Sequence, residues 1–188
     1  ASDFLMALQL TGAAKADSIA NMQLRLPVVV IGGGLTAIDT ATESLAYYVV
    51  QVEKFLHRYE ALAHEIGEDA IRDPWDDYER EIAEEFLAHA RAIRQERKQA
   101  GLAGREPRIA EMLRHWGGVT IAYRRRLVDS PSYTLNHEEV EKALEEGIWF
   151  AEGMTPVGVD VDHYGAARGI RLKNAGTGTE HWFPARTV

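Results

Sequence analysis

The chain has 188 residues, of which 46% are hydrophobic and 27% are charged, a composition typical of a folded globular domain and not of a disordered segment. Its formal net charge of −8 at pH 7 argues against nonspecific binding of nucleic acid, because a phosphate backbone is held mainly by clustered lysine and arginine. The chain has no cysteine, which excludes thiol redox chemistry and cysteine-ligated zinc or iron–sulfur clusters within these residues.

The ends of the chain and its apolar runs give expectations about location. No apolar run approaches the roughly 20 residues that cross a membrane, and the N-terminus lacks the order of a signal peptide. We therefore expect a cytoplasmic protein without a membrane partner. Because the sequence starts at Ala1 without a methionine and stops at Val188 directly after a strand-like segment, we expect it to be part of a longer protein.

The first 46 residues predict a short helix, a loop, a strand and the start of a second helix. Ser2 or Asp3 can cap the short helix, and the small polar residues at 11–21 indicate a loop. The β-branched run at residues 26–31 is typical of a strand buried on both faces in a parallel sheet. After three glycines, apolar residues from Leu35 onward fall at helical spacing.

Residues 44–116 have helical periodicity and no strand signal. Apolar stripes at intervals of three and four predict two long helices, the second with Asp73 as its N-cap and Pro74 at its first position. Pro107 can open a further short helix. We interpret residues 44–116 as an independent helical insertion that a short linker could replace.

Residues 117–188 return to alternating strands and helices. A strand is predicted at residues 119–123, then a helix capped by Asn136, then a strand at 148–150. Three short antiparallel strands are expected at 157–161, 169–172 and 181–183. The fold class is thus α/β: a Rossmann-like parallel sheet, formed by residues 1–43 and 117–188, with an antiparallel β-meander and a large all-helical insertion.

A Gly-x-Gly-x-x-Ala motif lies between the first strand and its helix. Gly32 permits a tight turn, Gly34 lets the backbone approach a pyrophosphate, and Ala37 lets the helix pack closely on the strand. The helix N-terminus supplies free N–H groups for phosphates. The motif and its context predict dinucleotide binding, the alternative being a glycine turn with only a structural role.

The residues after the second strand indicate which dinucleotide is bound. Glu53 stands about 20 residues after the glycines, where an acid often binds the ribose, but it lies within a helical stripe. The strand at 119–123 ends instead in Arg124, Arg125 and Arg126. Guanidinium groups there would pair with a 2′-phosphate, which favours NADP over NAD, the alternative being a solvated basic strand end.

The insertion contains histidines that invite a metal interpretation. Three Glu–His pairs are four residues apart on helical faces, namely Glu53–His57, Glu60–His64 and Glu85–His89. None has the Glu-x-x-His spacing of di-iron bundles, so we predict ordinary surface pairing and no metal site. Trp75, Tyr78 and Trp116 are interpreted as packing residues.

These segments resemble the NADPH-binding domain of the glutamate synthase small subunit and its relatives, FAD enzymes of the pyridine nucleotide-disulfide oxidoreductase superfamily. The resemblance rests on residues 28–39, 119–125 and 138–147, on Pro131 and on the opening residues 1–5. It covers about residues 1–44 and 117–185, and it leaves out the helical middle.

The resemblance implies a set of cofactor-binding residues and no catalytic residue. The positions that match the NADP(H) site are Gly32, Gly33, Gly34, Leu35, Thr36, Ala37, Asp39, Arg124 and Arg125. Among these, residues 32–37 would surround the pyrophosphate, Asp39 would lie near the nicotinamide, and the two arginines would hold the 2′-phosphate. Leu35 departs from the polar residue common at its position, and Asp129 stands where a further arginine is usual.

The implied function is presentation of NADPH for hydride transfer to FAD. The FAD would be held by a domain of the parent protein outside this chain, which is the expected partner, so we expect the chain alone to be inactive and to bind no flavin. The insertion is expected to contact another subunit or a second copy. Two alternatives stay open: a noncatalytic NAD(P)-sensing module, and an interaction module in which the helical insertion is the working part.

Overall fold

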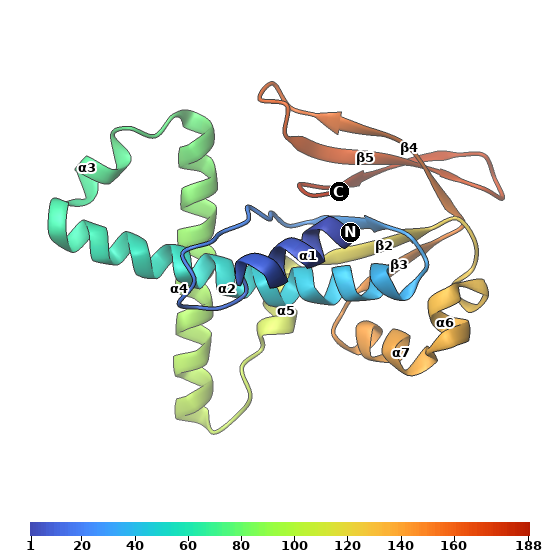
Figure 1. Cartoon of the computed structure of the whole chain (residues 1–188), viewed down its shortest axis with the longest axis horizontal. Helices are drawn as coiled ribbons and strands as arrows, with labels where there is room; N and C mark the ends of the chain where they lie inside the picture. The colour runs from blue at the N-terminus through green and yellow to red at the C-terminus, as the bar shows by residue number, and fades with distance from the viewer.

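The computed structural model describes all 188 residues and has three layers (Figure 1). A parallel sheet lies between a layer of helices and a second, antiparallel sheet. The expected α/β class is confirmed: the structure has a Rossmann-like parallel sheet, an antiparallel meander and a large all-helical region. No helix combines the length and the apolar character that a membrane crossing requires.

The parallel sheet has three strands in the order β1-β2-β3. These are β1 (Val28–Ile31), β2 (Val119–Tyr123) and β3 (Trp149–Glu152). Near the chain end, Thr187 forms a parallel bridge with Val28, and its carbonyl accepts the N–H of Val29 at 2.9 Å. The strand predicted at 26–31 is therefore confirmed over residues 28–31 as an inner strand, with neighbours on both sides and with residues 28–30 buried.

Helices cover one face of this sheet. They are α1 (Ser2–Thr11), α2 (Leu35–Ile66), α6 (Pro131–Leu135) and α7 (His137–Glu145). Val28, Val30 and Ile121 point toward them and join a core cluster of 26 buried residues, to which α7 contributes Val140 and Ala143. The short α6 was not predicted from the sequence, and it packs against the glycine loop.

The antiparallel sheet covers the other face. Its strands are β4 (Met154–Val161), β5 (Ala167–Asn174) and β6 (Glu180–Pro184), in the predicted meander order β4-β5-β6. Ile170 and Leu172 of β5 form a small buried cluster with Val29 of β1 and Ala122 of β2. Val28 and Val30 thus pack on the helical face of the parallel sheet, and Val29 packs on the face covered by the antiparallel sheet.

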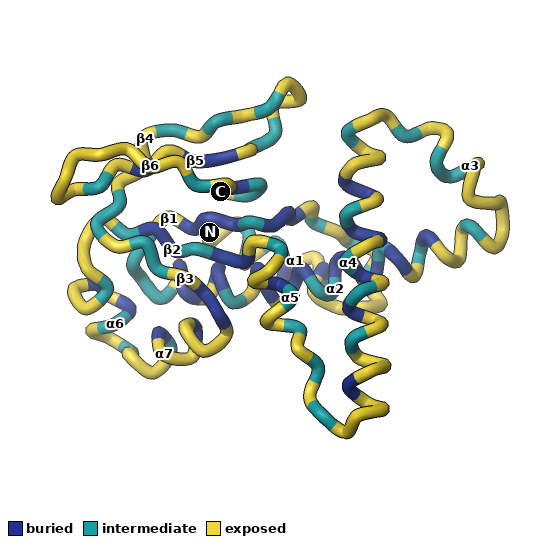
Figure 2. The backbone as a smooth tube through the Cα atoms, turned by 180° about the vertical axis from the view of Figure 1, so that it is seen from behind, coloured by how far each residue is buried: buried dark blue, intermediate teal, exposed yellow.

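Residues 44–116 contain helices only, as predicted. The second half of α2 is followed by α3 (Glu68–Arg72), α4 (Asp77–Ala103) and α5 (Ile109–His115). Figure 2 shows that the middle of α4 is buried against the domain while α3 and both ends of α4 are largely exposed. Trp75, Tyr78 and Trp116 pack against the main core cluster as partly buried side chains.

The predicted cap of the second long helix is wrong. Asp76, and not Asp73, is the N-cap of α4: its carboxylate accepts the N–H of Glu79 at 2.8 Å, and the Glu79 carboxylate accepts the N–H of Asp76 at 3.1 Å. This reciprocal pair satisfies two donors that a helix start leaves free, which a proline at position 74 cannot do. Asp73 instead follows the last residue of α3.

The predicted boundary between residues 43 and 44 lies inside α2. Buried side chains on both sides of it, such as Ile38, Ala41, Tyr48 and Val52, belong to the same core cluster. The division into a Rossmann-like part and an insertion stays a prediction. Because one helix and one core run through both parts, we now expect them to unfold together and not independently.

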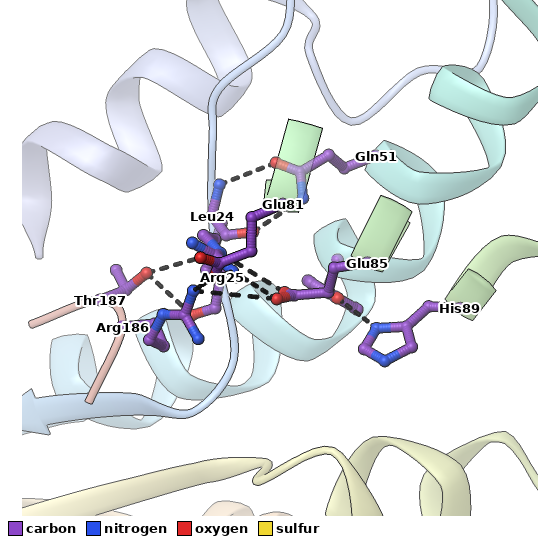
Figure 3. A network of polar contacts seen from close by, with 9 residues as sticks. Leu24, Arg25, Gln51, Glu81, Glu85, His89, Arg186 and Thr187 are labelled. Atoms are coloured by element: carbon purple, nitrogen blue, oxygen red, sulfur yellow. Dashed lines mark hydrogen bonds and ion pairs between the residues drawn. The ribbon is translucent and has the colours of Figure 1, made fainter. Parts of the chain in front are cut away.

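A polar network also ties α4 to the sheet (Figure 3). The buried Arg25 lies just before β1, and its guanidinium donates to Glu81 at 3.0 Å and to Glu85 at 2.5 Å. Arg186, near the chain end, donates to the same Glu81 carboxylate at 2.6 Å. The hydrogen bonds from these two arginines hold the pKa of Glu81 below its usual value. The Thr187 hydroxyl bonds to the backbone N–H and carbonyl of Arg25. The segment before β1 and the end of the chain are therefore bonded to each other and, through Arg25 and Arg186, to α4.

Candidate nucleotide-binding site

The glycine loop stands where the sequence predicts, between the carboxyl end of β1 and the first turn of α2. The Gly32 N–H donates to the carbonyl of Ala122 at 3.1 Å, which anchors the loop to β2. Gly34 is the N-cap of α2, with φ −96° and ψ 172°, and its carbonyl accepts the N–H of Ala37 at 3.0 Å. The chain therefore turns from strand to helix within three residues.

The three glycines of the loop differ in the space that surrounds them. A Cβ on Gly32 would lie 3.2 Å from the Cβ of Ala37, which supports the close helix–strand packing expected of this pair. A Cβ on Gly33 would lie 2.3 Å from the ring of Tyr123, so a larger residue there would have to displace this ring, which belongs to the last residue of β2. A Cβ on Gly34 would meet nothing within 4 Å. The open space thus adjoins the glycine expected to face a pyrophosphate.

The N-terminus of α2 has the features of an anion site. No side chain caps it, and its first turn contains no acidic residue, so no resident carboxylate competes for the N–H groups at this helix end. Leu35 is half-buried and Thr36 is exposed in this turn, and Ala37 is buried. A phosphate approaching Gly34 would meet the positive end of a 32-residue helix.

The arginines lie at the same edge of the sheet as the glycine loop. The parallel register pairs Ile31 of β1 with Ala122 of β2. Gly33 comes two residues after Ile31, and Arg124 comes two residues after Ala122, so the two loops leave the sheet at the same level. Neighbouring strands are about 4.8 Å apart, which brings the two loops together. Arg124 and Arg125 are exposed and form no ion pair. Their guanidinium groups are therefore available to a ligand.

Arg126 differs from its two neighbours because an internal partner holds it. Its guanidinium forks onto the Asp129 carboxylate with bonds of 2.8 and 3.1 Å. This hydrogen bonding lowers the pKa of Asp129 below its usual value. Asp129, noted in the sequence as a departure from the expected arginine, thus neutralises the third arginine of the run.

Two contacts fix the backbone of the arginine loop to the end of β3. The N–H of Gly153 donates to the carbonyl of Arg125 at 3.0 Å, and the Glu152 carboxylate accepts the N–H of Leu127. Sequence reasoning did not identify Glu152, because its partner lies 25 residues away and no motif marks the pair. The loop is therefore held by its backbone while Arg124 and Arg125 project freely.

The first turn of α6 contacts the glycine loop from another side. The N–H of Ser132 donates to the carbonyl of Gly33 at 3.0 Å, and the hydroxyls of Ser130 and Ser132 lie 3.0 Å apart, fully buried. Ser130 caps α6 and Pro131 occupies its first turn. Serine followed by proline is a helix-start signal that could have revealed this helix from sequence.

Asp39 lies on the second turn of α2, exposed, beside a cavity of about 460 Å³ between α1 and α2. Lys15 and Glu43 border the same cavity. The structure therefore groups the glycine loop with Arg124 and Arg125 at the strand ends, and it places Asp39 on the side of α2 that faces α1.

The predicted surface pairing of glutamate with histidine is wrong, because each of the three glutamates pairs with an arginine instead. Glu60 forms an ion pair with Arg94 at 2.7 Å, Glu53 pairs with Arg97, and Glu85 pairs with Arg25. No group of three or more potential ligands is placed to hold a metal ion. Nδ1 of His89 lies 2.6 Å from the Tyr48 hydroxyl, its ring stacks on Trp116 at 3.8 Å, and burial lowers its pKa.

Comparison with known proteins gives one clear relative and no function. No family model matches the chain. The "Uncharacterized protein RP006" of Rickettsia prowazekii is 42% identical over 172 residues, which cover 92% of this chain and 22% of that protein. The chain thus spans about a fifth of the length of the relative that it matches.

Proposed function

We propose that the chain binds NADP(H) as the nicotinamide-nucleotide domain of a flavin-dependent oxidoreductase similar to the glutamate synthase small subunit. The observation that carries the proposal is the pairing of two features at one sheet edge. An uncapped helix N-terminus preceded by glycines adjoins two arginines without ion pairs, on adjacent parallel strands. Ligands of open α/β sheets bind outside the carboxyl ends of the strands, where both features lie.

The residues of this chain bind and orient the nucleotide. The N-terminus of α2 and the open side of Gly34 would hold the pyrophosphate, and Arg124 and Arg125 would hold the 2′-phosphate through charge-assisted hydrogen bonds. When bound, NADPH supplies a hydride, whose acceptor we expect to be FAD in another domain of a longer protein. No residue of the chain has to act as acid, base or nucleophile, so the chain alone is expected to be inactive.

Calorimetric titration of the purified chain with NADPH and with NADH tests this proposal. We expect both nucleotides to bind, NADPH more tightly, because only NADPH offers a phosphate to Arg124 and Arg125. We also expect a colourless protein that binds no FAD. Failure of both nucleotides to bind would overturn the proposal, and stoichiometric flavin in the purified chain would reassign the glycine loop to FAD.

A noncatalytic NAD(P)-sensing module would give the same binding result. The two functions can be distinguished in a longer protein, such as the relative described above, that contains a domain like this chain. In an oxidoreductase, adding NADPH to that protein should bleach a flavin absorption band near 450 nm, whereas a sensor should bind NADPH without any such change.

A further inference from the structure

The insertion carries a cavity that the nucleotide site does not use. It has a volume of about 280 Å³ and lies between α2, α4 and the extended segment that precedes β1. Six of its ten lining residues are hydrophobic, among them the aromatic side chains of Phe55, Trp75 and Phe86. Glu79 is the one charged residue of the lining. The cavity is thus apolar inside, with a carboxylate as its charged element.

One wall of this cavity is formed by residues 21–23, and the backbone of this segment is hydrogen-bonded on one side only. The N–H and carbonyl of Met22 bond to the Tyr47 hydroxyl at 2.6 and 2.8 Å. The N–H and carbonyl of Leu24 bond to the Gln51 side-chain amide, both at 2.8 Å. Side chains of α2 therefore satisfy the backbone groups of every second residue along this segment.

Asn21 and Gln23, which alternate with Met22 and Leu24, have the opposite orientation. In an extended chain, the backbone groups of successive residues point to opposite edges, so those of Asn21 and Gln23 point away from Tyr47 and Gln51. Both residues are exposed and line the cavity, and their N–H and carbonyl groups bond to no other group of the protein. Residues 21–25 belong to no strand, but unpaired backbone groups along one side of such a segment can pair with another extended chain, as an unpaired strand edge does.

We propose that this cavity binds an extended segment of a partner protein by strand addition. The segment pairs its main chain with Asn21 and Gln23, places a large apolar side chain against Trp75 and Phe86, and sets a basic side chain near Glu79. Main-chain pairing contributes affinity in this mode of recognition, and the pocket contributes specificity. The cation is inferred from the Glu79 carboxylate, since opposite charges favour association. This site is separate from the proposed nucleotide site.

The test uses the full chain and a defined probe, a capped pentapeptide of sequence lysine–valine–phenylalanine–valine–lysine, measured by calorimetry. Gln23→Pro removes the exposed main-chain donor, and Gln23→Ala is its matched control because it keeps that donor. A net hydrogen bond of about 1 kcal/mol predicts a roughly fivefold loss for Gln23→Pro relative to Gln23→Ala. An unchanged unfolding midpoint and unchanged NADPH binding confirm that the fold and the other site are intact.

Glu79→Gln tests the charge, because glutamine at this position keeps the capping box while removing the carboxylate. We expect weaker binding of the basic peptide at low salt, and we expect wild type to bind a peptide with glutamates in place of the lysines more weakly. No binding of the basic peptide to wild type would overturn the proposal, as would equal binding by the two Gln23 variants. A concentration-dependent dimer that Gln23→Pro abolishes would assign the cavity to a second copy of the chain and also overturn it.

Discussion

Replacing Arg124 or Arg125 by alanine should weaken NADPH binding selectively. NADPH and NADH differ only by the 2′-phosphate, which carries a charge of about −1.5 to −2 at neutral pH. A hydrogen bond to a charged group contributes about 1.5–3 kcal/mol, which corresponds to a roughly tenfold to hundredfold change in affinity. Both arginines are exposed, so solvent screening places the expected loss near the lower end, about tenfold.

Arg126→Ala provides the matched control, because Asp129 already holds its guanidinium. Calorimetric titration of the three variants with both nucleotides should show a loss for NADPH with Arg124→Ala and Arg125→Ala, and little change with Arg126→Ala. NADH affinity should stay near that of wild type in all three. The salt dependence of NADPH binding should also fall in the first two variants, since fewer charges remain to be screened. Equal losses for NADPH and NADH would refute the assignment of these arginines to the 2′-phosphate.

Three further predictions concern the stability of the protein. Gly33→Ala should destabilise the protein by about 1–3 kcal/mol in urea unfolding, because the new Cβ would overlap the Tyr123 ring. Gly34→Ala should cost less, about 1 kcal/mol or below, because its Cβ meets no atom and only the N-cap preference for glycine is lost. Arg25→Ala should cost about 3 kcal/mol while unfolding stays a single transition; two separate transitions would show that α4 and the sheet are independent. Burial lowers the pKa of His89 in the folded state, so the unfolded state, with a histidine pKa of about 6.5, binds more protons in acid. Stability should therefore fall as the pH drops below about 6.5. His89→Phe should flatten this pH dependence in thermal melts across about pH 5–8, and an unchanged slope would exclude His89 as the source of the pH dependence.

The parts of the fold that follow from local patterns were predictable from sequence. The β-branched run of β1, the Gly-x-Gly-x-x-Ala turn and the start of α2 are contiguous, so their pattern alone fixes their order in space. The same holds for the three strands of the meander, whose turns are marked by glycine and asparagine. The run of arginines after β2 reaches the glycine loop because parallel strands end at the same sheet edge.

The parts that depend on contacts between distant segments were not predictable. The Tyr123 ring leaves no room for a side chain at position 33 without a shift, yet 90 residues separate the two and no motif connects them. The shared core was not predictable either, because periodicity marks a helix but not the core that it joins, and α2 joins one core along most of its length. By contrast, Arg126 and Asp129 are three residues apart, so their ion pair could have been predicted from the sequence.

The proposed nucleotide site can be located from backbone amide shifts on addition of NADPH, because at 21.0 kDa the chain suits two-dimensional NMR. We expect NADPH to cause the largest shifts in two groups of amides: Gly33, Gly34, Leu35 and Thr36 in the first, and Arg124 and Arg125 in the second. NADH should shift the first group much more than the second. Shifts confined to the cavity beside Asp39, or no saturable shifts at the glycine loop, would contradict a nucleotide site at the carboxyl ends of β1 and β2.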